Sequence, residues 1–195
     1  MKIGYYVQGS MDEAFVWGLK KRWCPDAELA PGKFRGSSHE SFRREIRKAL
    51  IDLRDSKRCD VLVVLTDADV NRWRDVKQRE FARVPENCRD LTVFGVSDRN
   101  IECWLALDRG AMARELKCQV GEIPGDDPSG FVKRRLGMGE RDANREQAKE
   151  RVEQFVSESQ LKWWIEHSDS FQDFYDQIWS LSKRVKCDMP NEREN

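Results

Sequence analysis

The chain has 195 residues with 35 basic and 35 acidic side chains, so it carries no formal net charge at neutral pH. This balance excludes attraction of the whole molecule to nucleic acid or anionic lipid and leaves only local basic patches for such contacts. Charged residues make up 36% of the chain and its mean hydropathy is -0.77, which leaves no run of about 18 apolar residues for a membrane span. The chain opens without a signal-peptide pattern, and we expect a soluble, cytoplasmic protein with no membrane partner.

Six cysteines are spread over the chain without a Cys-x-x-Cys pair, and the two histidines lie far from them in the sequence. This spacing argues against a zinc site. Because no secretory feature is present, we expect reduced thiols, several of them buried, in preference to the alternative of a disulfide framework.

The first 110 residues alternate between strand and helix patterns. An aromatic, β-favouring segment over 2–8 leads into a helix pattern over 11–23, and a weak strand pattern over 27–30 follows. A clear amphipathic helix begins after a cap at Ser38 or Ser41 and runs to Leu53.

The continuous apolar run over 61–65 is typical of a parallel strand that helices bury on both faces. A helix is expected over 70–82 and a further strand over 91–96. The alternation predicts an α/β fold over residues 1–110, with a mostly parallel sheet flanked by helices.

After Asp108 the sequence shows helix patterns and no convincing strand. The strongest of these patterns covers 170–185, where aromatic and aliphatic residues recur at steps of three and four. We therefore expect residues 111–195 to form a helical C-terminal extension that packs on the core. The last ten residues, 186–195, are polar, and we expect them to be frayed.

Polar clusters follow three of the expected strands, which is where an open parallel sheet binds its ligands. Gln8 ends the first strand, Asp67 and Asp69 follow the central strand, and Glu102 follows the third. Two carboxylates one residue apart can converge on a hard cation such as Mg²⁺, and Glu102 can complete the site. The alternative is structural: Asp67 begins a turn, Asp69 caps the next helix, and Glu102 is a capping or solvated residue.

These clusters resemble the toprim family. The segment 7–16 is similar to its opening motif, in which a strand ends in Glu-Gly and an Asp follows at the start of the first helix. Residues 62–69 resemble its Asp-x-Asp motif. The segment 100–108 resembles the Ile-Glu-x-Trp-Leu-x-x-Asp stretch of small bacterial toprim-like proteins, some of which occur beside phage-defence or restriction genes. The resemblance covers roughly residues 1–110 and implies a toprim, Rossmann-like sheet.

The resemblance also implies a nuclease that uses Mg²⁺ or Mn²⁺ to hydrolyse phosphodiesters in phage defence or DNA processing. Asp67, Asp69 and Glu102 would then hold the metal, and Gln8 would orient the scissile phosphate or the attacking water. Gln8 stands where toprim enzymes carry a glutamate, and an amide cannot exchange a proton near neutral pH. The alternative is therefore a toprim-like binding subunit with impaired catalysis.

Nucleic acid is the partner that either function implies, and a protein partner such as an ATPase is a further candidate. The expected substrate-binding residues are Gly9, Arg72, Arg74 and Lys77, which lie beside the strand-end motifs. A basic rim next to a metal site would suit a phosphodiester, although a basic run is also typical of an ordinary solvated helix face. A receiver or flavodoxin-type signalling module fits the alternation as well, but a receiver would need an acidic pair at the end of the first strand.

Overall fold

The computed structural model of the chain describes residues 1–33, 38–137, 142–185, 187 and 189–194. In this part of the chain four strands form one parallel sheet in the order β2-β1-β3-β4. The strands are β1 (Lys2–Tyr6), β2 (Glu28–Pro31), β3 (Val61–Asp67) and β4 (Thr92–Ser97). The predicted α/β fold with a parallel sheet is confirmed, and the weak pattern over 27–30 does form an edge strand.

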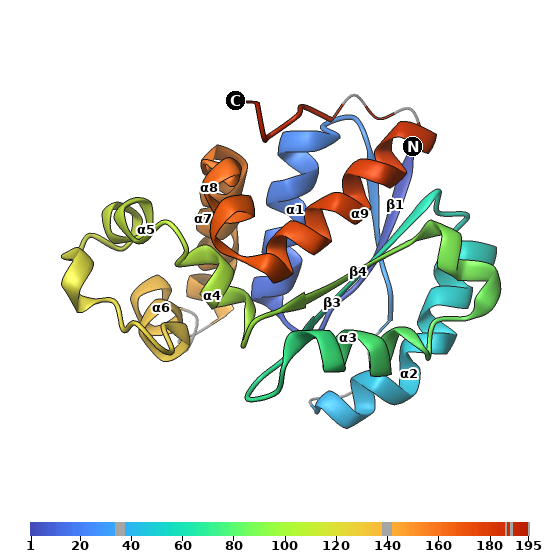
Figure 1. Cartoon of the computed structure of the whole chain (residues 1–195), viewed down its shortest axis with the longest axis horizontal. Helices are drawn as coiled ribbons and strands as arrows, with labels where there is room; N and C mark the ends of the chain where they lie inside the picture. Colours follow the sequence, from blue (N-terminus) through green and yellow to red (C-terminus); the bar gives the residue numbers. More distant parts are fainter. Residues whose placement is uncertain (34–37, 138–141, 186, 188, 195) are drawn as a thin grey trace.

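Helices cover both faces of the sheet (Figure 1). One face packs against α1 (Ser10–Trp23) and α9 (Asp169–Val185), and the other packs against α2 (His39–Ile51) and α3 (Trp73–Phe81). Successive residues of a strand point to opposite faces. Val61, Val63 and Leu65 of β3 accordingly belong to the core on the α1 side, while Leu62 and Val64 belong to the core on the α2 side. The same alternation directs Asp67, which is two residues after Leu65, toward the α1 side.

After β4 the described part of the chain forms helices joined by loops and no strand, as the sequence predicts. Its helices are α4 (Ile101–Leu105), α5 (Arg109–Leu116), α6 (Ser129–Leu136), α7 (Asp142–Glu158) and α8 (Leu161–His167), followed by α9. Figure 1 shows α4, α5 and α6 beyond the carboxyl end of β4, at the left of the view. Short 3₁₀ or π turns cover Asp52–Ser56, Glu86–Leu91 and Val120–Glu122. None of the described helices is long and apolar enough to cross a membrane.

The helices α7 and α9 complete the core of the sheet region rather than forming a core of their own. Phe171 and Phe174 of α9 and Val152 and Val156 of α7 belong to the same buried cluster as β1, β3 and α1. Gly18 lets α1 and α7 approach closely, because a Cβ atom at this position would lie 2.6 Å from Cβ of Val156. Placing glycine in the middle of a helix costs about 1 kcal/mol, which the close packing offsets.

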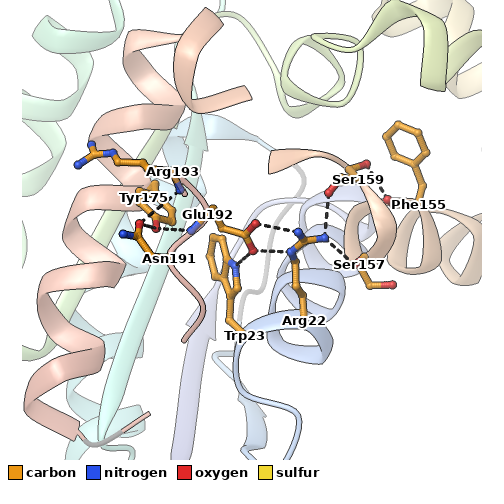
Figure 2. Close-up of polar contacts among 9 residues, drawn as sticks. All are labelled: Arg22, Trp23, Phe155, Ser157, Ser159, Tyr175, Asn191, Glu192 and Arg193. Carbon is orange, nitrogen blue, oxygen red and sulfur yellow. Dashed lines mark hydrogen bonds and ion pairs between the residues drawn. The ribbon is translucent and has the colours of Figure 1, made fainter. Parts of the chain in front are cut away.

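The C-terminal tail is docked, and the prediction that it frays is wrong for the residues described. Glu192 is 1% exposed, and both of its carboxylate oxygens accept hydrogen bonds from Arg22, at 2.5 and 2.7 Å (Figure 2). The indole of Trp23 donates to Glu192 Oε1 at 2.9 Å, and the backbone N–H of Glu192 donates to the Tyr175 hydroxyl at 3.1 Å. The tail is polar in composition, yet the side chain of Glu192 is buried and its carboxylate is hydrogen-bonded.

A disulfide between Cys24 and Cys187 joins this tail to the end of α1. The expectation that all thiols are reduced is therefore wrong for this pair. Cys59, Cys88, Cys103 and Cys118 remain free thiols, and the first two are buried as expected. The pair could not be predicted because 163 residues separate the two cysteines and only the fold brings α1 and the tail together.

Candidate active site at the carboxyl edge of the sheet

A polar pocket of about 300 Å³ opens where β1 and β3 end. The N-terminal ends of α1, α2 and α4 reach it from the sheet region, while α6 and α7 reach it from the helical C-terminal region. It is lined by Gln8, Gly9, Ser10, Met11, Asp12, Ser38, His39, Asp67, Ile101, Glu102, Lys133 and Arg145. The pocket thus brings together four of the predicted site residues, which are Gln8, Gly9, Asp67 and Glu102.

Three carboxylates, those of Asp12, Asp67 and Glu102, form what we call the acidic floor of this pocket. Asp12 lies in the first turn of α1, where its Oδ2 accepts a hydrogen bond of 2.8 Å from the backbone N–H of Gly9. Asp67 is paired with Ser97 in the β3–β4 register, and the Ser97 hydroxyl donates to Asp67 Oδ1 at 3.0 Å. Glu102 lies in the first turn of α4 and is 1% exposed, while Asp12 is 7% exposed.

Burial and neighbouring carboxylates raise the pKa values of two residues of the acidic floor, Asp12 and Asp67. Burial raises the pKa of Asp12 well above its usual range, and the negative charges of Asp67 and Glu102 raise it further. Burial likewise raises the pKa of Asp67 to about 6, with added contributions from Glu102 and Asp69 and an opposing one from the Ser97 hydrogen bond. Asp12 and Asp67 are therefore costly to ionise unless positive charge enters the pocket.

Positive charge lies at the rim of the pocket. The ammonium of Lys133, on α6, lies 3.2 Å from Glu102 Oε1. The guanidinium of Arg145, on α7, donates from Nε to the Ser10 hydroxyl at 3.2 Å. Both side chains come from the helical C-terminal region, so the two parts of the chain build the pocket together.

Gln8 and Asp69 lie on either side of His39. Gln8 Nε2 lies 3.0 Å from His39 Nδ1, and His39 Nε2 lies 3.7 Å from Asp69 Oδ2. The backbone of Asp69 has a φ of 54°, and its side chain is 48% exposed. The turn after β3 therefore directs Asp69 to His39, outside the pocket lining, while Asp67 remains on the floor.

The predicted metal ligands are thus only partly brought together: Asp67 and Glu102 share the pocket, and Asp69 lies outside it. Among the residues that the structure describes, no three His, Cys, Asp or Glu side chains stand close enough to form a ready metal site. The donor chemistry nevertheless fits a hard divalent cation. Asp12 adds a third carboxylate to those of Asp67 and Glu102, and Glu102 Oε1 is buried without a hydrogen-bond partner.

The basic residues expected to bind substrate lie elsewhere. Arg74 forms an ion pair of 2.8 Å with Asp169, and Lys77 forms one with Asp173. Both aspartates belong to α9. A spacing of three residues places Arg74 and Lys77 on one face of α3, and that face is turned toward α9 rather than toward the pocket. Arg72 is the residue before α3 and does not line the pocket either.

Four residues of the pocket with acidic or basic side chains were not predicted as site residues: Asp12, His39, Lys133 and Arg145. Asp12 carried a usable signal, because an acidic side chain three residues after the Gly9 turn falls at the start of α1, where its carboxylate can cap the helix. Lys133 belongs to the basic run over 133–135, one of the runs that the sequence offers for nucleic-acid contact, whereas Arg145 carried no signal. Only the packing of α6 and α7 places the two side chains at the edge of the sheet.

No protein-family model, curated protein or solved structure matches this chain. The pocket and the motifs of the sequence are therefore the features from which a function is inferred.

Proposed function

We propose that the protein is a nuclease that uses Mg²⁺ or Mn²⁺ to hydrolyse phosphodiester bonds. The observation that carries the proposal is that Asp12, Asp67 and Glu102 line one pocket whose rim holds Lys133 and Arg145. A deep acidic floor suits a divalent cation, and a cationic rim suits the phosphate that such a cation binds. The toprim-like order of the three strand-end motifs, on a four-stranded parallel sheet, supports the same function.

In this proposal Asp12, Asp67 and Glu102 hold the ion. The bound ion supplies a Lewis acid for a phosphoryl oxygen and lowers the pKa of a bound water. The Gln8 side chain contacts His39 through its amide nitrogen, and we assign its carbonyl oxygen to orienting the attacking water. Asp69 then acts through His39 rather than as a metal ligand.

A second function, that of a toprim-like binding subunit, is favoured by the amide at position 8. Gln8 cannot take up or release a proton near neutral pH, so it cannot serve as the general acid or base. A chain of this kind would bind the cation and a nucleic-acid phosphate without cleaving it. Either function is compatible with a place in phage defence or DNA processing and with a partner such as an ATPase.

The first test is a cleavage assay. Plasmid, single-stranded DNA and RNA would be incubated with the purified protein and Mg²⁺ or Mn²⁺, with and without the proteins encoded beside its gene. We expect cleavage that Asp67→Asn and Glu102→Gln abolish. Asp169→Asn is the matched control, because Asp169 is an exposed carboxylate on α9 outside the pocket.

Metal binding is measured separately by thermal denaturation. A ligand that binds only the folded state stabilises it by about 2.7 kcal/mol at a hundredfold excess over its dissociation constant. Stabilisation by Mg²⁺ without cleavage of any substrate would favour the binding subunit. The absence of stabilisation by either ion would contradict both functions.

A further inference from the structure

The pairing of Lys133 with Glu102 joins a fixed carboxylate to an accessible ammonium. Glu102 is 1% exposed at the start of α4, whereas the side chain of Lys133 on α6 is 49% exposed. A lysine side chain has a long flexible stem, and an exposed one moves at little cost. The carboxylate is thus held in place, and the ammonium reaches it from the solvent side.

The contact compensates charge without satisfying the carboxylate. Lys133 Nζ lies 3.2 Å from Glu102 Oε1, yet this buried oxygen has no partner with hydrogen-bond geometry. The other oxygen, Oε2, lies 3.4 Å from the Ser129 hydroxyl, which is a long hydrogen bond. A buried carboxylate gains most when its oxygens are fully coordinated, so Glu102 is left with capacity for a better cation.

The pocket also holds more carboxyl groups than Lys133 alone can balance once they ionise. Asp12 and Asp67 share the acidic floor with Glu102, and among the described cations that line the pocket only Lys133 forms an ion pair with a floor carboxylate. Arg145 is directed to the Ser10 hydroxyl at the start of α1 instead. A divalent cation beside Glu102 would bring twice the charge of the ammonium to a pocket that also holds Asp12 and Asp67.

We propose that Lys133 is a replaceable counterion: a divalent cation displaces its ammonium from Glu102, and the released ammonium then binds the substrate phosphate together with Arg145. This inference rests on the proposed function and assigns it a phosphate-recognition pair. No bond is made or broken in the exchange, since one ion pair replaces another. The exchange couples the two ligands, because phosphate binding is favoured only after the metal has freed the lysine.

The first arm of the test measures Mg²⁺ alone by calorimetry, without any nucleic acid. Lys133→Met should tighten Mg²⁺ binding by about three- to tenfold, because it removes a cation that competes for Glu102. Arg134→Met is the matched control, since Arg134 is the next residue on α6, is exposed and does not line the pocket. It should leave Mg²⁺ binding unchanged. Lys133→Gln, which keeps a hydrogen-bond donor for Glu102, serves if Lys133→Met fails to fold.

The second arm measures binding of thymidylyl-(3′→5′)-thymidine, which contains one phosphodiester, by equilibrium dialysis at saturating Mg²⁺. Lys133→Met and Lys133→Gln should weaken binding by about tenfold or more, the usual effect of losing a charge-assisted hydrogen bond. Lys133→Arg should restore most of it, and Arg134→Met should have no effect. Without Mg²⁺, the wild type and the Lys133 variants should all bind the dinucleotide weakly.

The outcomes separate this inference from the function on which it rests. Mg²⁺ binding that is weaker or unchanged in both Lys133→Met and Lys133→Gln overturns the exchange and leaves the metal site standing. The absence of Mg²⁺ binding in the wild type and in all variants overturns the metal site and the exchange together. Tighter Mg²⁺ binding with weaker dinucleotide binding supports the exchange, even if the cleavage assay fails and the protein proves to be a binding subunit.

Discussion

Asp67 illustrates how a candidate catalytic residue can lower the stability of the fold. Because its pKa is raised from 3.8 to about 6, the folded state binds a proton more tightly than the unfolded state does. The stabilisation is complete below pH 4 and is lost as the pH rises toward 6 and beyond. Asp67→Asn removes this loss, and we expect it to raise the free energy of unfolding at pH 8 by about 1 to 3 kcal/mol.

Urea denaturation at pH 5 and pH 8 would check this expectation, and the gain should be smaller at pH 5. Asp169→Asn is the control, since Asp169 is an exposed carboxylate on α9 outside the pocket. Equal stability of Asp67→Asn and the wild type at pH 8 would contradict the raised pKa.

Gln8 is the residue at which the nuclease and the binding subunit diverge. If the amide has removed the proton-transfer group, Gln8→Glu should create or raise metal-dependent cleavage, because general acid–base catalysis typically contributes a factor of about 10² to 10⁴. If Glu102 already supplies that group, the wild type cleaves, Glu102→Gln abolishes cleavage, and Gln8→Glu changes little. Initial rates on plasmid and single-stranded DNA distinguish the two. If neither the wild type nor Gln8→Glu cleaves any substrate, the proposed nuclease activity is contradicted.

The site was predictable to the extent that it depends on strand ends. Gln8, Asp67 and Glu102 meet because parallel strands with crossovers of one hand end at the same edge. Asp69 was misplaced because one left-handed residue reverses the direction of the turn after β3, and an Asp-x-Asp pattern does not encode that conformation. Lys133 could not be paired with Glu102 because their contact depends on how α6 packs against α4.

At the scale of elements, β4 shows how the fold protects an open sheet edge. As the last strand of the sheet, β4 directs alternate backbone groups away from β3, and such groups need partners. Gln177 of α9 supplies them: the N–H of Phe94 donates to Gln177 Oε1 at 3.0 Å, and Gln177 Nε2 donates to the Phe94 carbonyl at 3.1 Å. One side-chain amide thus takes the place of a neighbouring strand.

We expect Gln177→Leu to destabilise the fold by about 1 to 3 kcal/mol, because it leaves two backbone groups of Phe94 without partners. Urea denaturation measures the loss, and light scattering would report any association through the uncovered edge. Gln172→Leu is the matched control, since Gln172 is an exposed glutamine on the same helix. A Gln177→Leu variant as stable as Gln172→Leu would show that the amide does not protect the edge.

The elements themselves were largely predictable from periodicity, and their ends were not. The helix expected over 70–82 begins only at Trp73, because residues 68–71 form a turn in which the N–H of Asn71 donates to the carbonyl of Ala68. The strand expected over 61–65 continues to Asp67, because pairing with β4 extends through the Asp67–Ser97 register. Partners from other elements set both boundaries.

At the scale of the whole molecule, the tail closes the fold on itself. The Cys24–Cys187 disulfide and the Glu192 contacts both join the last residues to the end of α1. Arg22 also donates to the carbonyl of Ser157, at the end of α7, at 3.0 Å and to that of Ser159, just after α7, at 2.8 Å (Figure 2). A single guanidinium therefore ties α1, the end of α7 and the tail together.

Glu192 should therefore contribute to stability far more than a polar tail residue ordinarily does. Removing one partner of a buried ion pair leaves the other charge uncompensated and typically costs about 3 to 5 kcal/mol. We expect a loss of this size for Glu192→Ala, and a smaller one for Glu192→Gln, which keeps an acceptor for the indole of Trp23. Glu194→Ala, an exposed glutamate two residues further on, is the matched control and should change stability by less than about 0.5 kcal/mol.

Urea denaturation of the oxidised protein measures these differences while the disulfide still tethers the tail. Repeating the measurement with dithiothreitol separates the two attachments, because reduction removes the tether and leaves the Glu192 contacts in place. If the contacts dock the tail by themselves, Glu192→Ala should cost a similar amount in both conditions. If the loss of stability caused by Glu192→Ala vanishes on reduction, the disulfide alone holds Glu192 against Arg22. If that loss is no larger than the loss caused by Glu194→Ala in either condition, the buried ion pair does not stabilise the fold.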